Sequence, residues 1–217
     1  MSARTVGRLI VLEGIDGSGT TTQLARLGQT LSARNLACVC TREPTPGPVG
    51  RLIRSALSHE LESDGVPVAL DFRSMALLFA ADRADHNERV IRPALSAGKL
   101  VLSDRYTLSS LLYQSLTAPS GVDCLQWLVA INSSAEVPDL VIVLDVDADV
   151  AAERRARRGG APELFEQDLL QRRLAEGYRN ASSVLQGQRV VVLDGNRSPE
   201  LVEREIQEQV DRLLNER

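Results

Sequence analysis

Residues 9–23 read Leu-Ile-Val-Leu-Glu-Gly-Ile-Asp-Gly-Ser-Gly-Thr-Thr-Thr-Gln. An apolar run is followed by a glycine-rich turn and then by residues that can open a helix. This layout predicts a phosphate-binding loop, in which glycines let backbone N–H groups close around phosphate oxygens at the positive end of a helix. Gly14, Gly19 and Thr21 match the Walker A pattern, but Thr20 stands where that pattern has lysine.

Thr20 weakens the prediction of catalysis more than the prediction of nucleotide binding. In the usual loop a lysine ammonium reaches the outer phosphates and offsets charge during transfer, whereas a threonine hydroxyl donates one hydrogen bond and carries no charge. The glycine cradle and Thr21, the expected Mg2+ ligand, remain. Taken alone, the turn could equally be a tight connection between a strand and a helix, so the remainder of the chain has to decide.

The composition is typical of a globular protein that works in water. The 217 residues are 43% hydrophobic and 25% charged, with a net charge of −4. We expect one domain over residues 1–217, since no linker divides the chain. There is no apolar run near the roughly 20 residues of a membrane helix and no leader pattern, and the net charge gives no sign of nucleic-acid binding. These features predict a cytoplasmic protein with neither a nucleic-acid nor a membrane partner.

Cysteine and histidine offer no metal or disulfide pattern. The spacing of Cys38, Cys40 and Cys124 fits neither a disulfide framework nor a zinc site, and we expect buried free thiols. His59 and His86 have no other metal ligands near them in the sequence, and we expect both at the surface.

Apolar strands alternate with helical patterns along the chain. Strands are predicted at residues 8–13, 36–41, 99–103, 140–145 and 189–194. Helices are predicted at residues 19–33, 49–57, 67–97 with a bend or break before Pro93, 108–116, 122–134, 149–158, 164–186 and 199–214. Asp64-Gly65 marks a turn, and residues 159–162 form a flexible break. Five strands separated by helices predict an α/β fold with a doubly wound, five-stranded parallel sheet flanked by helices, as in P-loop nucleotide-binding proteins.

Polar residues gather where the predicted strands end. The first strand ends at Glu13 and the glycine loop, and the second is followed by Arg42 and Glu43. The third leads into Asp104 and Arg105. Ligands of such sheets bind beyond the carboxyl ends of the strands, so these residues are predicted to lie close together at a binding site.

Several of these stretches, in this order and spacing, resemble the bacterial thymidylate kinases. They are residues 13–23, Thr41-Arg42-Glu43-Pro44, residues 77–83, residues 90–98, Asp104-Arg105-Tyr106 with Tyr113-Gln114 beyond, and residues 138–145. The resemblance covers nearly the whole chain. It implies transfer of a phosphoryl group from ATP to dTMP with Mg2+, and a homodimer.

The resemblance also implies roles for individual residues. Phe79 would stack on thymine and Arg83 would bond the base edge, while Ser110 and Gln114 would read that edge and Tyr113 would crowd the 2′ position. The sugar 3′-hydroxyl would bond Asp16, and the acceptor phosphate would bind Arg105 with help from Arg42. The metal ligands would be Thr21 and Asp104, and the nucleotide cradle would comprise Gly14, Asp16, Gly17, Ser18, Gly19, Thr20, Thr21 and Thr22. Taken singly, Phe79 could equally be a core residue, Arg83 a solvated helix charge and Asp16 a turn residue.

The segment at about residues 153–166 resembles the family's lid, which closes over the phosphates. Arginines precede its glycines, at Arg154, Arg155, Arg157 and Arg158; for each of them a solvated helix charge is the alternative. We take Arg154 and Arg158, with Asp16 and Arg105, as catalytic candidates. Leu164 stands where bacterial relatives commonly have a further arginine.

Three functions stay open on the sequence. The first is a thymidylate kinase with turnover reduced by Thr20. The second is a homologue that binds nucleotides but has lost most phosphoryl transfer, which Thr20 and Leu164 favour. The third is a kinase for another deoxynucleoside monophosphate, because Ser110 and Gln114 offer both donors and acceptors.

Overall fold

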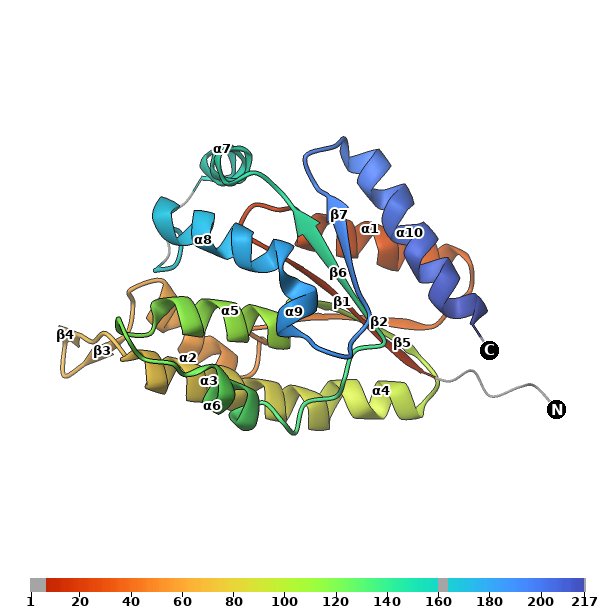
Figure 1. Cartoon of the computed structure of the whole chain (residues 1–217). Helices are drawn as coiled ribbons and strands as arrows, with labels where there is room; N and C mark the ends of the chain where they lie inside the picture. The colour runs from red at the N-terminus through yellow and green to blue at the C-terminus, as the bar shows by residue number, and fades with distance from the viewer. Residues whose placement is uncertain (1–6, 160–163, 217) are drawn as a thin grey trace.

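Five parallel strands form the central sheet of the computed structural model, which describes residues 7–159 and 164–216 (Figure 1). They are β1 (Arg8–Gly14), β2 (Cys38–Arg42), β5 (Leu100–Asp104), β6 (Leu140–Asp145) and β7 (Val190–Asp194), in the order β2-β5-β1-β6-β7. The strands read as almost uninterrupted apolar runs because helices cover both faces of the sheet. The predicted fold class is confirmed. The expected break at residues 159–162 falls largely outside the described residues.

Helices α1 (Thr20–Ala33) and α10 (Pro199–Asn215) cover one face of the sheet (Figure 1). Their apolar stripes, which include Leu27, Leu31 and Ile206, pack against Ile10, Leu12 and their neighbours in the sheet. The other face is covered by α2 (Pro48–Leu57), α3 (Phe72–His86), α4 (Arg92–Ser96), α5 (Thr107–Thr117), α6 (Leu125–Ile131), α8 (Asp168–Arg179) and α9 (Ala181–Val184). Helix α7 (Ala148–Arg158) lies above α8 in the view of Figure 1.

Strand register brings the predicted polar residues to one edge. Asp104 pairs with Leu12 of β1 on one side and with Arg42 of β2 on the other, and Gly14 pairs with Leu144 of β6. Because all five strands are parallel, their carboxyl ends meet at the same edge, where ligands of such sheets bind. The register therefore fixes how the glycine loop, Arg42 and Asp104 lie relative to one another.

The long helix predicted at residues 67–97 is wrong in its first turn. A short hairpin, β3 (Glu62–Ser63) and β4 (Val66–Pro67), turns at Asp64-Gly65 as expected, and α3 begins only at Phe72. Asp71 caps that helix by accepting from the N–H groups of Arg73 and Ser74, which favours a start at this point. The expected break before Pro93 takes the form of a π-helical turn, η1 (Asn87–Ile91), since proline has no N–H to continue the α pattern.

Four other predictions are corrected, two about helices and two about burial. The helix predicted at 164–186 is divided into α8 and α9, and the one at 122–134 is shorter, as α6. Cys40 is exposed and Cys38 half-buried because β2 is an edge strand, whereas Cys124 is buried, and all three thiols are free. His86 is buried, not at the surface. Within residues 7–159 and 164–216, no helix has the length and apolar character needed to cross a bilayer.

Candidate functional site

The glycine loop connects β1 to α1 in a conformation that needs glycine. Gly17 and Gly19 have φ of 90° and 96°, in the left-handed region that side chains disfavour. A Cβ at Gly17 would lie 2.5 Å from the carbonyl oxygen of Ala151, and one at Gly14 would lie 2.6 Å from Ser18 Oγ. Gly19 caps the N-terminus of α1, so Thr20, Thr21 and Thr22 form its first turn. The loop thus presents a helix N-terminus, where anions bind favourably.

Thr21 and Asp104 lie together beside this loop. Thr21 Oγ1 donates to Asp104 Oδ2 over 2.5 Å. Asp104 is 8% exposed, and its Oδ1 has no hydrogen-bond partner among the described residues. A hydroxyl beside a carboxylate with an unpaired oxygen fits a hard divalent cation such as Mg2+, which prefers oxygen ligands. This buried, unpaired oxygen supports the predicted metal role of the two residues.

Asp16, Arg105 and Tyr113 form a polar cluster next to the loop. Arg105 Nη2 donates to Asp16 Oδ1 over 2.6 Å, and Tyr113 OH donates to Asp16 Oδ2 over 3.0 Å. Arg105 Nη1 contacts the hydroxyls of Ser109, Tyr113 and Tyr178 at 3.2–3.3 Å. Arg105 also has a φ of 69°, which is unusual for a residue other than glycine. The backbone at Arg105 is therefore locally strained, in a conformation that directs the guanidinium toward Asp16.

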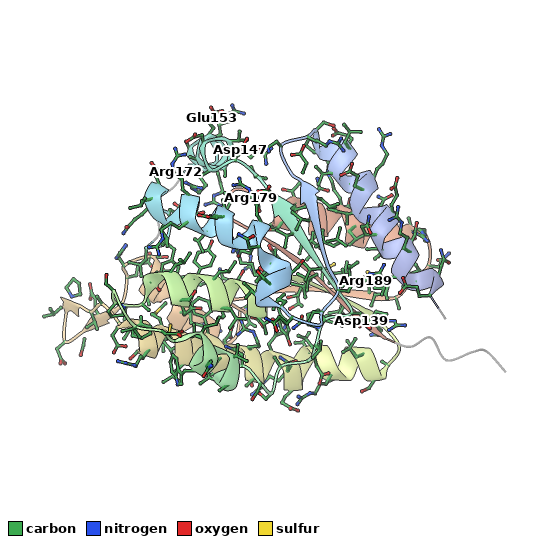
Figure 2. All side chains as sticks on the ribbon, viewed as in Figure 1. Asp139, Asp147, Glu153, Arg172, Arg179 and Arg189 are labelled. Carbon is green, nitrogen blue, oxygen red and sulfur yellow. The ribbon has the colours of Figure 1, made fainter. Side chains whose placement is uncertain are left out.

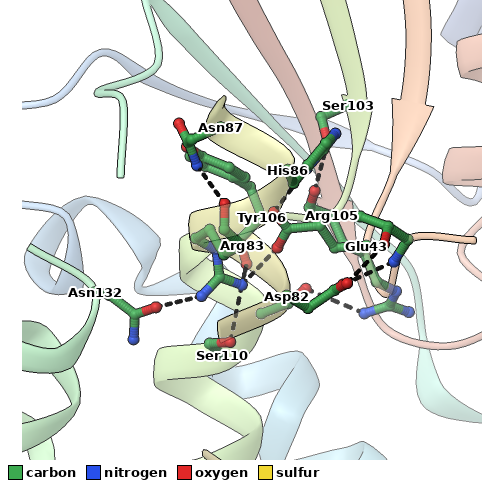
Figure 3. A network of polar contacts seen from close by, with 12 residues as sticks. Glu43, Asp82, Arg83, His86, Asn87, Ser103, Arg105, Tyr106, Ser110 and Asn132 are labelled. Atoms are coloured by element: carbon green, nitrogen blue, oxygen red, sulfur yellow. Dashed lines mark hydrogen bonds and ion pairs between the residues drawn. The ribbon is translucent and has the colours of Figure 1, made fainter. Parts of the chain in front are cut away.

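Arg83 is 2% exposed, and Figure 3 shows it bonded to side chains from several elements. Its Nη2 donates to Glu43 Oε2 over 2.6 Å, to Ser110 Oγ over 2.9 Å and to the Tyr106 carbonyl, and its Nη1 donates to Asn132. The Nε of this arginine is buried, with no hydrogen-bond partner in the described part of the chain. The Nε–H donor of Arg83 is therefore left over.

Gln114 is buried with both amide atoms unpaired. The residue is 1% exposed, and neither Nε2 nor Oε1 has a partner within residues 7–159 and 164–216. Buried polar groups are almost always hydrogen-bonded, and leaving one unpaired costs about 1–3 kcal/mol. An unpaired donor and an unpaired acceptor on one amide suit a ligand edge that carries both.

All the predicted substrate residues line one cavity of about 250 Å³, which we call the strand-end cavity. The predicted substrate residues in its lining are Asp16, Arg42, Phe79, Arg83, Arg105, Ser110, Tyr113 and Gln114. The predicted metal ligands Thr21 and Asp104 line the same cavity. The structure thus brings together residues from β2, the loop after β1, α3 and α5. Their roles toward a ligand stay predictions.

Only part of the predicted lid contributes to this region. Arg155 Nη1 donates to the carbonyl oxygen of Asp16 over 2.7 Å, and its side chain is 8% exposed. Arg154 contacts the carbonyls of Ser18 and Gly195 at 3.4 and 3.1 Å. Two guanidinium groups of α7 therefore already lie on the outer side of the glycine loop.

The other two arginines of α7 point elsewhere. Arg157 pairs with Glu153 on the exposed face of the helix, and Arg158, 63% exposed, pairs with Glu166. Further ion pairs, Arg172 with Asp149 and Arg179 with Asp145, join this region to α8 and β6 (Figure 2). Arg158 thus lies away from the loop in this structure, whereas Arg155, which was not among the catalytic candidates, touches it.

Several buried residues support the cavity through contacts that the sequence did not predict, although it placed Glu13 and Glu43 near the site. Glu13 is 0% exposed and accepts from Tyr106 N–H, Ser109 N–H and Oγ, and Tyr178 OH. Burial raises the pKa of this carboxyl group. Its position at the end of a strand was the only available signal. Glu13 therefore joins the start of α5 to β1.

Glu43 and His86 form a second support, beside Arg83 (Figure 3). His86 Nδ1 lies 3.0 Å from Glu43 Oε1, and its Nε2 lies 2.7 Å from Thr41 Oγ1. The buried Arg83–Glu43 pair explains why His86 is in the interior: it fills the remaining side of the carboxylate. A histidine in a polar helix sequence gave no signal of this role.

Comparison with known proteins identifies one family along almost the entire chain. The thymidylate kinase family model matches residues 12–206. The chain is 41% identical to a probable thymidylate kinase of Pyrococcus horikoshii over 185 residues, 85% of this chain and 87% of that protein. It is 39% identical to the thymidylate kinase of Pelotomaculum thermopropionicum over 96% of this chain and 95% of that protein. A probable thymidylate kinase of Methanosarcina barkeri is 35% identical over 96% of this chain and 98% of that protein.

Proposed function

Because the chain belongs to the thymidylate kinase family, we propose that it phosphorylates dTMP to dTDP with ATP as the donor and Mg2+ as the cofactor, as a step in dTTP synthesis. The observation that carries the proposal is the set of buried, unpaired polar atoms around one cavity: Asp104 Oδ1, Arg83 Nε and both amide atoms of Gln114. Release of ADP in a coupled assay, measured with and without dTMP, tests it. ADP release that does not depend on dTMP, or no release at all, would contradict it.

The acceptor nucleotide is proposed to fill the strand-end cavity. Phe79 stacks on the base, and Arg83, Ser110 and Gln114 bond its edge; a planar base with carbonyl and N–H groups matches the unpaired donors and acceptor there. Tyr113 crowds the 2′ position and Asp16 accepts from the 3′-hydroxyl. Arg105, with Arg42, binds the monophosphate through charge-assisted hydrogen bonds.

ATP is proposed to bind with its phosphates on the glycine loop, held by the N-terminus of α1. Thr21 and Asp104 would hold Mg2+, which when bound supplies positive charge to the donor oxygens. No general base is required, because the attacking phosphate oxygen is already ionised. The work of the protein is to align the two phosphates and to stabilise charge as it develops.

We propose reduced turnover, because Thr20 supplies no ammonium to the outer phosphates and Leu164 supplies no guanidinium. The same two residues favour the second candidate, a homologue that binds nucleotides with little transfer. Turnover with dTMP at saturating ATP–Mg2+ separates the two. A kinase for another deoxynucleoside monophosphate is tested by replacing dTMP in the same assay.

The whole chain is proposed to act as one unit, with a lid at about residues 153–166, and to work in the cytoplasm as a homodimer. Leu77 of α3 and Leu125 and Val129 of α6 are large apolar residues that are 41–51% exposed, which supports a protein partner on this side. Sedimentation of the purified protein measures the oligomeric state.

Replacing Phe79 with alanine should weaken dTMP binding about tenfold and leave ATP binding nearly unchanged, because stacking of a base on one aromatic ring contributes roughly 1–3 kcal/mol. Phe79 is half-buried and lines the strand-end cavity. Phe72→Ala is the matched control: this ring lies on the same helix but packs on Trp127, outside the cavity. Calorimetric titration measures both ligands. Unchanged dTMP affinity in Phe79→Ala would remove the stacking role.

Replacing Arg155 with methionine should lower turnover about tenfold at saturating substrates, because a buried guanidinium on the outer side of the phosphate loop would be lost. Arg157→Met is the control, since Arg157 lies on the same helix but is 78% exposed and pairs only with Glu153 among the described residues. Steady-state rates with both substrates saturating measure the effect. Equal rates for the two variants would show that contact with the loop does not matter.

A further inference from the structure

Gln171 of α8 uses its whole amide group to connect the phosphate loop with the lid segment. The residue is 0% exposed. Its Oε1 accepts from the backbone N–H of Asp16 at 3.2 Å, and its Nε2 donates to Asp16 Oδ2 at 3.0 Å and to the carbonyl of Phe165 at 2.7 Å. An amide nitrogen has two N–H donors, so both are occupied. Gln171 therefore fixes both the backbone and the carboxylate of Asp16.

These contacts give the two carboxylate oxygens of Asp16 different numbers of hydrogen bonds. Oδ2 accepts from Gln171 and from Tyr113 OH, whereas Oδ1 accepts only from Arg105 within the described chain. A carboxylate oxygen has about two acceptor sites, so Oδ2 is filled and Oδ1 keeps one free. The Asp16 side chain is 28% exposed and lines the strand-end cavity. A hydroxyl of a ligand in the cavity can thus bond Oδ1.

We propose that Gln171 is a positioning residue for the acceptor sugar: it orients the Asp16 carboxylate so that Oδ1 accepts from the 3′-hydroxyl. This inference rests on the function proposed above. It also couples the sugar contact to the lid, because Gln171 holds the Phe165 carbonyl and the Phe165 ring packs on Tyr113 with 5.4 Å between ring centroids. Without the amide, Asp16 loses one donor to Oδ2 and its backbone N–H loses its acceptor, so the carboxylate is free to turn away from the cavity.

The test compares two acceptor ligands that differ only in the hydroxyl in question. Calorimetry gives the dissociation constants of dTMP and of 3′-deoxythymidine 5′-monophosphate for the wild type and for Gln171→Leu. We expect dTMP to bind about tenfold more weakly to the variant, the usual size for loss of a hydrogen bond to a charged group. The 3′-deoxy ligand should change less than about threefold, because it makes no bond for Gln171 to orient. A structural role alone would weaken both ligands alike.

A second variant and a control keep the test decisive. Gln171→Glu preserves the side-chain shape but removes both N–H donors and sets a second carboxylate beside Asp16, so it should show the same selective loss. Gln167→Leu, at an exposed position four residues earlier, should behave as wild type.

Thermal melting monitors the fold; unfolding of both Gln171 variants would show a purely structural role and overturn the proposal. If the wild type binds no dTMP, the proposed function fails; if it does and the variants keep its preference for the 3′-hydroxyl, only the role of Gln171 fails.

Discussion

Replacing Arg105 with methionine is expected to lower kcat/KM for dTMP by about 10²–10³-fold, the range seen when one preorganised charged or polar donor is removed from a reaction centre. The guanidinium donates to one carboxylate, that of Asp16, and to the hydroxyls of Ser109, Tyr113 and Tyr178. The carboxylates of Asp104 and Glu13 also interact with it electrostatically. Because an arginine stays charged and presents a planar fork of donors, it can bind a doubly ionised phosphate at two points. Steady-state kinetics with dTMP varied at saturating ATP–Mg2+ measure the loss.

Arg8→Met controls for the loss of an arginine that pairs with an aspartate. Arg8 Nη1 lies 2.6 Å from Asp139 Oδ1, the same separation as in the Arg105–Asp16 pair, but at the amino end of β1 and thus at the opposite edge of the sheet (Figure 2). This variant should keep wild-type kinetics. If Arg105→Met retained more than about a tenth of the wild-type kcat/KM, a difference of 1.4 kcal/mol, Arg105 would not be a main phosphate contact.

The sheet could be predicted because its three central strands, β1, β5 and β6, are almost completely buried. Residues 8–13, 99–103 and 140–145 read as continuous apolar runs, and their parallel pairing follows from the helices between them. Helix boundaries were less accessible, because they depend on caps and on contacts distant in sequence. The start of α3 is set by the Asp71 cap, and the first turn of α8 carries Gln171, whose partner Asp16 is 155 residues away.

The roles of the cavity residues could be predicted largely because they resemble a family pattern; the contacts among the buried side chains that support the cavity could not. Glu13, Glu43, His86 and Gln171 contact other protein groups. In the sequence, each of these residues looks like an ordinary residue of a strand end or a helix. The residue that it contacts lies about 40 to 155 positions away, so the sequence gives no sign of the contact. The contact of Arg155 with the loop could not be predicted either. Four arginines lie within about one and a half turns of α7, and the sequence does not show which of them faces the loop.

The surroundings of Thr20 bear on what a lysine there would do. Thr20 is the first residue of α1 and 5% exposed, next to Thr21 and Asp104. Arg154 and Arg155 reach the loop from its outer side, through the carbonyls of Ser18 and Asp16. Because these guanidinium groups bond loop carbonyls, they stabilise the loop itself. A lysine at position 20 would instead place its charge at the N-terminus of α1, where the phosphates are proposed to bind.

Replacing Thr20 with lysine is therefore expected to raise turnover about 10- to 100-fold. Each 1.36 kcal/mol of added transition-state stabilisation raises the rate by about a factor of ten. A desolvated charge contact can supply about one or two such increments. The gain should appear in kcat and leave the KM for dTMP nearly unchanged, because the ammonium would act on the transferring group and not in the base pocket. Rates of the wild type and the variant, measured side by side with dTMP and saturating ATP–Mg2+, decide the point.

Two controls separate the position of the charge from its presence and from the bulk of the side chain. Gln29→Lys adds the same charge at an exposed site on α1, and Thr20→Met adds length without charge. Neither should be faster than the wild type, because exposed charges are screened and a thioether stabilises no phosphate. A Thr20→Lys enzyme that folds normally and is no faster than the wild type would contradict the proposal that the missing ammonium limits turnover. In that case a loss of turnover in Arg155→Met well beyond the roughly tenfold loss expected from its loop contact would assign the charge to α7, whereas full activity in that variant would exclude Arg155 as its source.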